Sequence, residues 1–292
     1  MDLSRAYTAL VTPFDSNLRL DEVGLRRNIR FQIEQGVDGV VPVGTTGESP
    51  TLTPEEHERV IEIAVEESKG KAKVIAGTGS NNTEEAIHYT RFAKKAGADA
   101  ALIISPYYNK PTQEGLYQHF KKIAEAVDLP IILYNVPSRT GRNIDAETTI
   151  RLSKIKNIVG IKEACCDLEQ IMQIINNTPE DFIVLSGEDS WTYAMMALGA
   201  RGVISVASNL APASVSDMVH EYLSGNLEAS RTLHYKYLDL FKVIFIETNP
   251  GPVKAAMNMM GMPAGEPRLP LVSPTAESKK QIKAVLSKLG LI

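Results

Sequence analysis

Eight short apolar segments, separated by longer amphipathic stretches, constrain the fold of this chain more than any other feature. The segments are rich in β-branched residues and almost continuously apolar, which is typical of parallel strands buried on both faces. Eight such strand–helix units within about 225 residues predict a (β/α)8 TIM barrel. The predicted strands are Tyr7–Val11, Gly39–Val43, Val74–Gly77, Ala100–Ser105, Ile131–Asn135, Ile158–Glu163, Ile183–Gly187 and Gly202–Val206.

Signals at the helix ends support this interpretation. Thr53-Pro54-Glu55-Glu56 is a capping box with proline at the first helical position. Gly36, Gly97 and Gly199 each precede a predicted strand and are expected to end a helix in the left-handed conformation. A doubly wound open sheet is the alternative, but it would place a Gly-rich turn where this chain has Thr12-Pro13-Phe14-Asp15. Further predicted N-caps are Asn82, Thr112 and Asp145.

Charge, apolar runs and residue spacing along the whole chain argue against several classes of function. We expect residues 1–225 to form the barrel and residues 226–292 to form a C-terminal helical extension. The formal net charge is -4 and no basic stripe is present, which argues against a nucleic-acid partner. The absence of a long apolar run and of a signal-peptide layout predicts a cytoplasmic protein without membrane contact. The histidines and the adjacent Cys165 and Cys166 lack metal-ligand spacing, so no metal is expected.

Polar residues follow several predicted strands at the end where barrel enzymes place their active sites. Gly44-Thr45-Thr46-Gly47-Glu48 follows the second strand and predicts either an anion-binding nest of N–H groups or a plain tight turn. Tyr134 ends the fifth strand and is either a proton relay or rim packing. Arg139 follows it in a loop, where it either binds a substrate carboxylate or makes a surface ion pair.

Lys162 is the sharpest single feature, because it interrupts the apolar sixth strand. It alternates with Glu163, so one of the two charged side chains must face the barrel interior. Gly160 is expected to leave open space beside Lys162 on the same face. Burial disfavours the ammonium form, and a neutral amine can attack a ketone. The alternative is a lysine that extends to solvent from the end of the strand, and in a barrel we favour the nucleophile.

Four motifs occur in order at the predicted strand ends. In them the chain resembles the pyruvate-dependent class I aldolases, the family of dihydrodipicolinate synthase and N-acetylneuraminate lyase, from about Ala6 to Pro270. The doubled Thr45-Thr46 and the Ser138-Arg139-Thr140 segment resemble the synthase branch. The motifs are Gly44–Glu48, Tyr107–Pro111, Tyr134–Gly141 and Ile161–Ala164.

The resemblance implies a specific reaction. It is the Schiff-base condensation of pyruvate with L-aspartate 4-semialdehyde to 4-hydroxy-tetrahydrodipicolinate, the first committed step of lysine and diaminopimelate biosynthesis. No cofactor is implied. Lys162 would form the Schiff base, Arg139 would bind the aldehyde's carboxylate, and Thr45 and Thr46 would bind that of pyruvate. The resemblance also implies a proton relay of Thr46, Tyr134 and Tyr108 and backbone lining by Gly187 and Ile204.

The same resemblance extends to assembly and regulation. It implies a homotetramer built as a dimer of dimers, with Tyr108 donated by the neighbouring subunit. It also implies L-lysine as an inhibitor, although Pro50 and Pro54 differ from the pattern of inhibited members. Separately, the pair Cys165-Cys166 stands where the family usually has small residues such as serine and glycine. The positions that match a lysine site are Ser49, His57, Asn81, Glu85 and Tyr107.

Two other functions stay open on sequence alone. N-acetylneuraminate lyase or a 2-keto-3-deoxy sugar-acid aldolase would use the same Lys162 and Tyr134. A catalytically silent barrel would bind a keto acid without forming an adduct.

Overall fold

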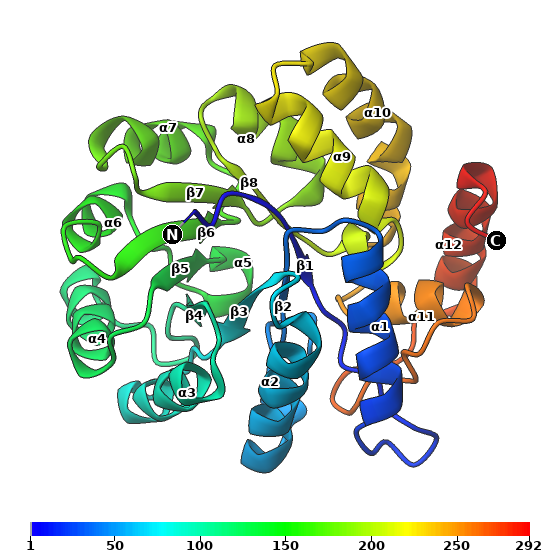
Figure 1. The fold of residues 1–292 in the computed structure, drawn as a ribbon, viewed down its shortest axis with the longest axis horizontal. Coiled ribbons are helices and arrows are strands. Elements are labelled where there is room, and N and C mark those ends of the chain that lie inside the picture. The colour runs from blue at the N-terminus through cyan, green and yellow to red at the C-terminus, as the bar shows by residue number, and fades with distance from the viewer. Residues whose placement is uncertain (1) are drawn as a thin grey trace. The chain divides into compact units, whose positions relative to one another are not determined.

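The eight predicted strands form a closed parallel barrel in the computed structural model, which describes residues 2–292. Each strand pairs with its neighbours in the sequence, and Arg5 N donates to Arg201 O (2.7 Å) beside the start of the last strand. The TIM-barrel prediction is confirmed, and the open-sheet alternative is wrong. The strands, shown in Figure 1, are β1 Arg5–Ala9, β2 Gly39–Val41, β3 Lys73–Gly77, β4 Ala100–Ile104, β5 Ile131–Asn135, β6 Ile158–Glu163, β7 Ile183–Ser186 and β8 Gly202–Ser205.

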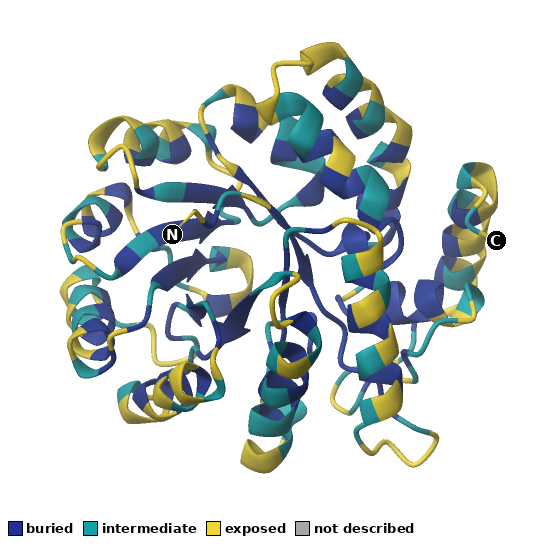
Figure 2. Cartoon of the chain, in the orientation of Figure 1, coloured by how far each residue is buried: buried dark blue, intermediate teal, exposed yellow. Residues whose placement is uncertain are grey.

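Helices follow the strands and bury one face each, while their other faces are exposed, as Figure 2 shows. This is the stripe expected of amphipathic helices that cover a sheet. The α-helices are α1 Glu22–Glu34, α2 Pro54–Ser68, α3 Thr83–Ala96, α4 Gln113–Ala126, α5 Pro137–Thr140, α6 Ala146–Leu152, α7 Leu168–Asn177, α8 Thr192–Ala197, α9 Pro212–Leu223, α10 Leu227–Val243, α11 Gly251–Met259 and α12 Ala276–Leu289. Three 3₁₀ turns are η1 Ser49–Thr51, η2 Asp189–Trp191 and η3 Ala207–Asn209.

Most of the predicted helix signals act as expected. Thr53 and Glu56 form both hydrogen bonds of the capping box on α2. Asp145 stands at the N-cap of α6, but its carboxylate accepts from Asn143 Nδ2 (2.9 Å) rather than from a helix N–H. Asn82 and Thr112 cap α3 and α4 through their side chains. The three glycines before strands are left-handed, with φ of 85° at Gly36, 99° at Gly97 and 115° at Gly199.

The chain divides into two compact units. One contains Ile75–Ile204 and the segment that ends at Arg5, and the other contains Ala6–Val74 and Ser205–Ile292. The C-terminal helices α10 to α12 therefore belong to the same unit as β2, α1 and α2. The predicted boundary between residues 225 and 226 stays a prediction.

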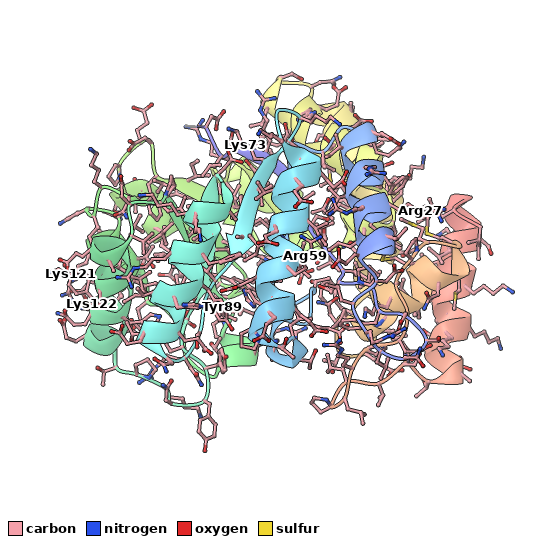
Figure 3. The ribbon with its side chains drawn as sticks, turned by 60° about the horizontal axis from the view of Figure 1, so that its bottom comes forward. Arg27, Arg59, Lys73, Tyr89, Lys121 and Lys122 are labelled. Atoms are coloured by element: carbon pink, nitrogen blue, oxygen red, sulfur yellow. The ribbon has the colours of Figure 1, made fainter. Side chains whose placement is uncertain are left out.

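Ion pairs tie α1 to α2 within the second unit. Arg59 of α2, labelled in Figure 3, pairs with Glu22 of α1 at 2.8 Å. Arg26 of α1 pairs with Glu67 of α2, also at 2.8 Å. These contacts join α1, which precedes β2 in the sequence, to α2, which follows it. The Thr45-Thr46 turn comes after β2. Among residues 2–292, no helix has the length and apolarity needed to cross a membrane.

Candidate active site

Lys162 faces the barrel interior. In the strand register it lies beside Tyr134 of β5 and Leu185 of β7, whereas Glu163 occupies the other face of β6. Gln170 of α7 donates to Glu163 Oε2 (3.3 Å), so the Glu163 face is the one turned towards the helices. Only 5% of Lys162 is exposed, which contradicts the alternative of a lysine that extends to solvent. A side chain that is strongly hydrated when charged is thus held among strands, where its charged form is costly.

The end of the Lys162 side chain lies against Tyr134. Its Nζ is 4.3 Å from the centroid of the Tyr134 ring. Gly187 makes room for the lysine, because a Cβ there would lie 3.1 Å from Lys162 Cε and 2.8 Å from Ala164 Cβ. Gly160 does not leave the expected open space, since a Cβ there would lie 2.5 Å from Ile183 O. The physical reason for Gly160 is instead the close approach of β7.

A buried polar cluster fixes the strand end immediately after Lys162. Asn135 Nδ2 and the Cys165 N–H both donate to Glu163 Oε1 at 2.9 Å. Burial raises the pKa of the fully buried Glu163, and its hydrogen bonds oppose that rise. Asn135 and Gln170 were not predicted as site residues. A signal existed, because a carboxylate that faces buried helices needs donors nearby.

Two predicted site residues are exposed and follow strands of the same unit. Tyr108 follows β4, is 89% exposed and has a left-handed φ of 71°. Arg139 is exposed and lies in the short helix α5 after β5 rather than in the predicted loop, because Pro137 starts a helical turn there. Ile204, by contrast, is buried in β8. An exposed tyrosine in a strained backbone conformation is uncommon and is typical of a functional or contact position.

Three of the five residues expected to bind lysine lie close together. Asn81 Nδ2 donates to Tyr107 O (3.2 Å), and Ser80 Oγ donates to the Glu85 carboxylate. Burial, followed by the charge of Glu85, raises the pKa of Tyr107. In the other unit, Ser49 begins η1 and His57 is buried in α2.

The Thr45-Thr46 turn is a compact hydrogen-bonded loop after β2. The Gly47 and Glu48 N–H groups donate to the carbonyls of Gly44 and Thr45, both at 3.1 Å. Thr46 is buried and Thr45 is half-buried. The left-handed residue in this turn is Glu48, with φ of 56°, rather than either of its glycines. Gly47 is required for space, because a Cβ there would lie 3.1 Å from the Val43 backbone.

Residues from the C-terminal part of the second unit hold this turn. Asn249 Nδ2 donates to Thr46 Oγ1 (3.0 Å). Lys254 of α11 pairs with Glu48 at 2.5 Å, and both side chains are almost completely buried. Neither contact was predicted from the sequence. Lys254 stands in a run of buried apolar residues from Gly251 to Met257, which was a usable signal for a buried charge.

Among the described residues 2–292, no group of three or more histidine, cysteine or acidic side chains is placed to hold a metal ion. Cys165 and Cys166 are free thiols, and burial raises the pKa of each.

Comparison with known proteins decides the family. The model of the dihydrodipicolinate synthetase family matches residues 2–289. The chain belongs to the dihydrodipicolinate synthetase family. The 4-hydroxy-tetrahydrodipicolinate synthase of Syntrophus aciditrophicus is 53% identical over 287 residues, 98% of each chain. Lys162, Tyr134 and the Thr45-Thr46 turn therefore lie within a full-length family match.

Two solved members of the family carry informative ligands. The dihydrodipicolinate synthase of Acinetobacter baumannii, complexed with pyruvate, has a TM-score of 0.97 and 43% identity, with 100% of both chains covered. That of Cyanidioschyzon merolae, with lysine bound, has a TM-score of 0.96 and 42% identity, with 99% of both chains covered.

Proposed function

We propose that this member of the dihydrodipicolinate synthetase family condenses pyruvate with L-aspartate 4-semialdehyde to give 4-hydroxy-tetrahydrodipicolinate, in the biosynthesis of lysine. The observation that carries the proposal is the buried Lys162 amine, 4.3 Å from the Tyr134 ring centroid, on the interior face of β6. Family membership along the whole chain supports the same reaction. A buried amine beside a phenol is suited to adding to a ketone, because both groups exchange protons during imine formation.

The chemistry follows from the lysine. The Lys162 amine adds to the keto carbon of pyruvate and, with loss of water, gives a protonated imine. This imine is an electron sink, so the methyl group of pyruvate loses a proton and becomes an enamine carbon. The enamine attacks the aldehyde of L-aspartate 4-semialdehyde. The amino group of that substrate then displaces Lys162 as the ring closes, which regenerates the free lysine.

The other predicted residues take roles around this centre. Thr45 and Thr46 bind the carboxylate of pyruvate. Tyr134 transfers protons to and from the imine nitrogen and the departing water, with Thr46 and Tyr108 completing the relay. Arg139 binds the second substrate's carboxylate through its guanidinium group, and Gly187 and Ile204 line the pocket with backbone groups.

Assembly belongs to the same proposal. The relay requires Tyr108 from a neighbouring subunit of a homotetramer that is a dimer of dimers. Its exposed side chain supports this role, because 89% of a large aromatic ring faces solvent in the single chain. Analytical ultracentrifugation of wild type and of Tyr108→Phe separates assembly from chemistry. The variant should remain tetrameric and lose activity.

A substrate panel tests the reaction. Turnover is measured with pyruvate and L-aspartate 4-semialdehyde, and in parallel with N-acetylneuraminate and with a 2-keto-3-deoxy sugar acid. We expect turnover with the first pair alone. Arg139→Ala should raise the KM for the semialdehyde much more than that for pyruvate. Faster cleavage of either sugar acid would assign the chain to a sister activity.

Feedback by L-lysine is the finer part of the proposal. The cluster of Asn81, Glu85 and Tyr107 supplies a carboxylate and a phenol suited to an amino acid, and the C. merolae relative is described with lysine bound. With Ser49 and His57 these residues would form the lysine site. Calorimetric titration with L-lysine should release heat, and Glu85→Ala should abolish it. Unchanged heat in the variant, or none in wild type, would contradict this site.

A further inference from the structure

Three contacts join the segment from Asn249 to Arg268 to the Thr45-Thr46 turn and the residues after it. Asn249, which precedes α11, donates its side-chain N–H to Thr46 Oγ1 at 3.0 Å. Lys254, in the first turns of α11, pairs with Glu48 Oε1 at 2.5 Å. The Arg268 backbone N–H donates to Glu48 Oε2 at 2.9 Å. About 200 residues of sequence separate the two sides of each contact, so the tertiary fold alone brings them together.

The direction of the Asn249 bond determines what Thr46 does with its hydroxyl proton. The amide NH₂ group is a donor only, so Thr46 Oγ1 is the acceptor in this pair. The hydroxyl hydrogen of Thr46 is therefore available for another acceptor. A carboxylate oxygen accepts and never donates when it is ionised. Asn249 thus sets the polarity that Thr46 needs to bind the carboxylate of a keto acid.

The Glu48 carboxylate fixes the backbone of Glu48 itself, two residues after Thr46. Glu48 has a left-handed φ of 56°, a conformation that non-glycine residues rarely adopt without support from their surroundings. Both of its carboxylate oxygens are engaged, one by Lys254 and the other by Arg268 N–H. Lys254 Nζ also donates to Glu266 O (3.3 Å) and lies 4.1 Å from the centroid of the Phe14 ring. The lysine also offsets a buried negative charge beside a turn that would bind an anion.

We infer that Asn249 and Lys254 are positioning residues for the Thr45-Thr46 turn. Asn249 directs the Thr46 hydroxyl as a donor to the carboxylate of pyruvate. The pair of Lys254 and Glu48 holds the turn's backbone and neutralises its buried charge. The segment expected to be an extension outside the barrel is thus part of the substrate-binding apparatus. This inference rests on the proposed function.

A double-mutant cycle tests the role of Asn249. The readout is the pyruvate concentration that gives half-maximal trapping of Lys162 by borohydride, with the melting temperature measured beside it. Asn249→Ala should raise this concentration about tenfold, the scale of one positioned hydrogen bond. In a Thr46→Val background the same change should have no further effect, because the asparagine acts through that hydroxyl. Equal effects in both backgrounds would overturn the role.

The isosteric Asn249→Asp variant sharpens the test. An aspartate accepts the Thr46 hydroxyl proton and turns the lone pairs of Thr46 towards the substrate, so it should weaken pyruvate binding more than alanine does. A purely structural role predicts the opposite order, because aspartate preserves the shape of the side chain. Asn258→Ala in α11 is the matched control, since its amide donates to Gly265 O (3.1 Å) rather than to Thr46 or Glu48. It should leave the pyruvate dependence unchanged.

Lys254→Met tests the second positioning residue. Methionine is unbranched, one atom shorter than lysine and uncharged, so half-maximal trapping should require several-fold more pyruvate. Adding Glu48→Gln should recover part of the loss, because it removes the unpaired buried carboxylate. A lower melting temperature with unchanged pyruvate dependence would limit Lys254 to a structural role. If wild type itself is not labelled by pyruvate and borohydride, the proposed function fails, whereas normal labelling in every variant refutes only the positioning.

Discussion

Gly187→Ala is the substitution that most directly probes the space around Lys162. The new methyl group would lie 2.8 Å from Ala164 Cβ and 3.1 Å from both Glu163 O and Lys162 Cε. All three distances are shorter than ordinary van der Waals contact, so the loop, the lysine or both must move. Overpacking of this kind costs about 1–3 kcal/mol.

That range sets the expected loss of activity. If the cost appears in the geometry of Lys162, imine formation slows by roughly fivefold to a hundredfold, since about 1.4 kcal/mol corresponds to a factor of ten. The rate is measured by quenching with borohydride at short times and quantifying the pyruvate adduct by mass spectrometry. Thermal unfolding of the same samples reports how much of the cost falls on stability instead.

Two further variants separate the lysine from general crowding. Ala164→Gly combined with Gly187→Ala removes the tightest contact and should recover stability more than it recovers the rate, because the contact with Lys162 Cε remains. Gly115→Ala in α4 is the control, since its new methyl meets Pro111 Cβ at 3.1 Å and no site residue. The reasoning is refuted if Gly187→Ala forms the adduct at the wild-type rate with an unchanged melting temperature.

The other predictions concern the proton relay, acid stability and the α1–α2 contact. Tyr134→Phe should lower kcat by roughly a hundredfold, the usual scale for a positioned proton-transfer group, and wild-type turnover would contradict the relay. Burial lowers the pKa of His119 from 6.5 to about 4. The unfolded chain therefore binds a proton that the folded chain excludes. The free energy of unfolding should fall by about 3 kcal/mol at most as the pH drops from about 6.5 to about 4, and this contribution should be constant above that window. Urea unfolding should show a smaller slope in His119→Gln than in wild type, because burial also lowers the pKa of His234 and that contribution remains. An equal slope in both proteins would exclude His119 as a source. Arg59→Ala removes an exposed ion pair with Glu22 and should change the free energy of unfolding by less than about 1 kcal/mol, whereas a larger loss would show that the pair is structurally required.

The sequence predicted the fold well because barrel strands leave a strong local pattern. A short, mostly apolar run between capped helices is readable without any tertiary information, as at Ile131–Asn135, where the predicted and observed strands coincide. Boundaries were less accurate where the apolar run continues into the following turn. Val43, for example, was assigned to the second strand, but β2 ends at Val41.

The chemistry of the candidate site was predictable only where one residue conflicted with its neighbours. Lys162 in an apolar strand is such a conflict. Because side chains alternate along a strand, either Lys162 or Glu163 had to face the barrel interior. The contact between Glu163 and Gln170 identifies the face of Lys162, because it shows which side of β6 meets the helices.

Contacts between distant segments leave no comparable pattern in the sequence. Asn249 and Thr46 lie about 200 residues apart, and nothing in either segment indicates that they meet. Gly160 illustrates a different limit, since a glycine signals that space is short without saying which atom occupies it. At Gly160 the carbonyl oxygen of Ile183 fills the space that was expected to be open.

Labelling of Lys162 tests the central claim most directly. The protein is incubated with pyruvate, reduced with borohydride, digested and analysed by mass spectrometry, with Lys162→Ala treated in parallel. We predict one reduced pyruvate adduct on the peptide that contains Lys162 and none on the variant. An unlabelled Lys162 peptide in active wild-type protein, or an adduct on another lysine, would contradict the account.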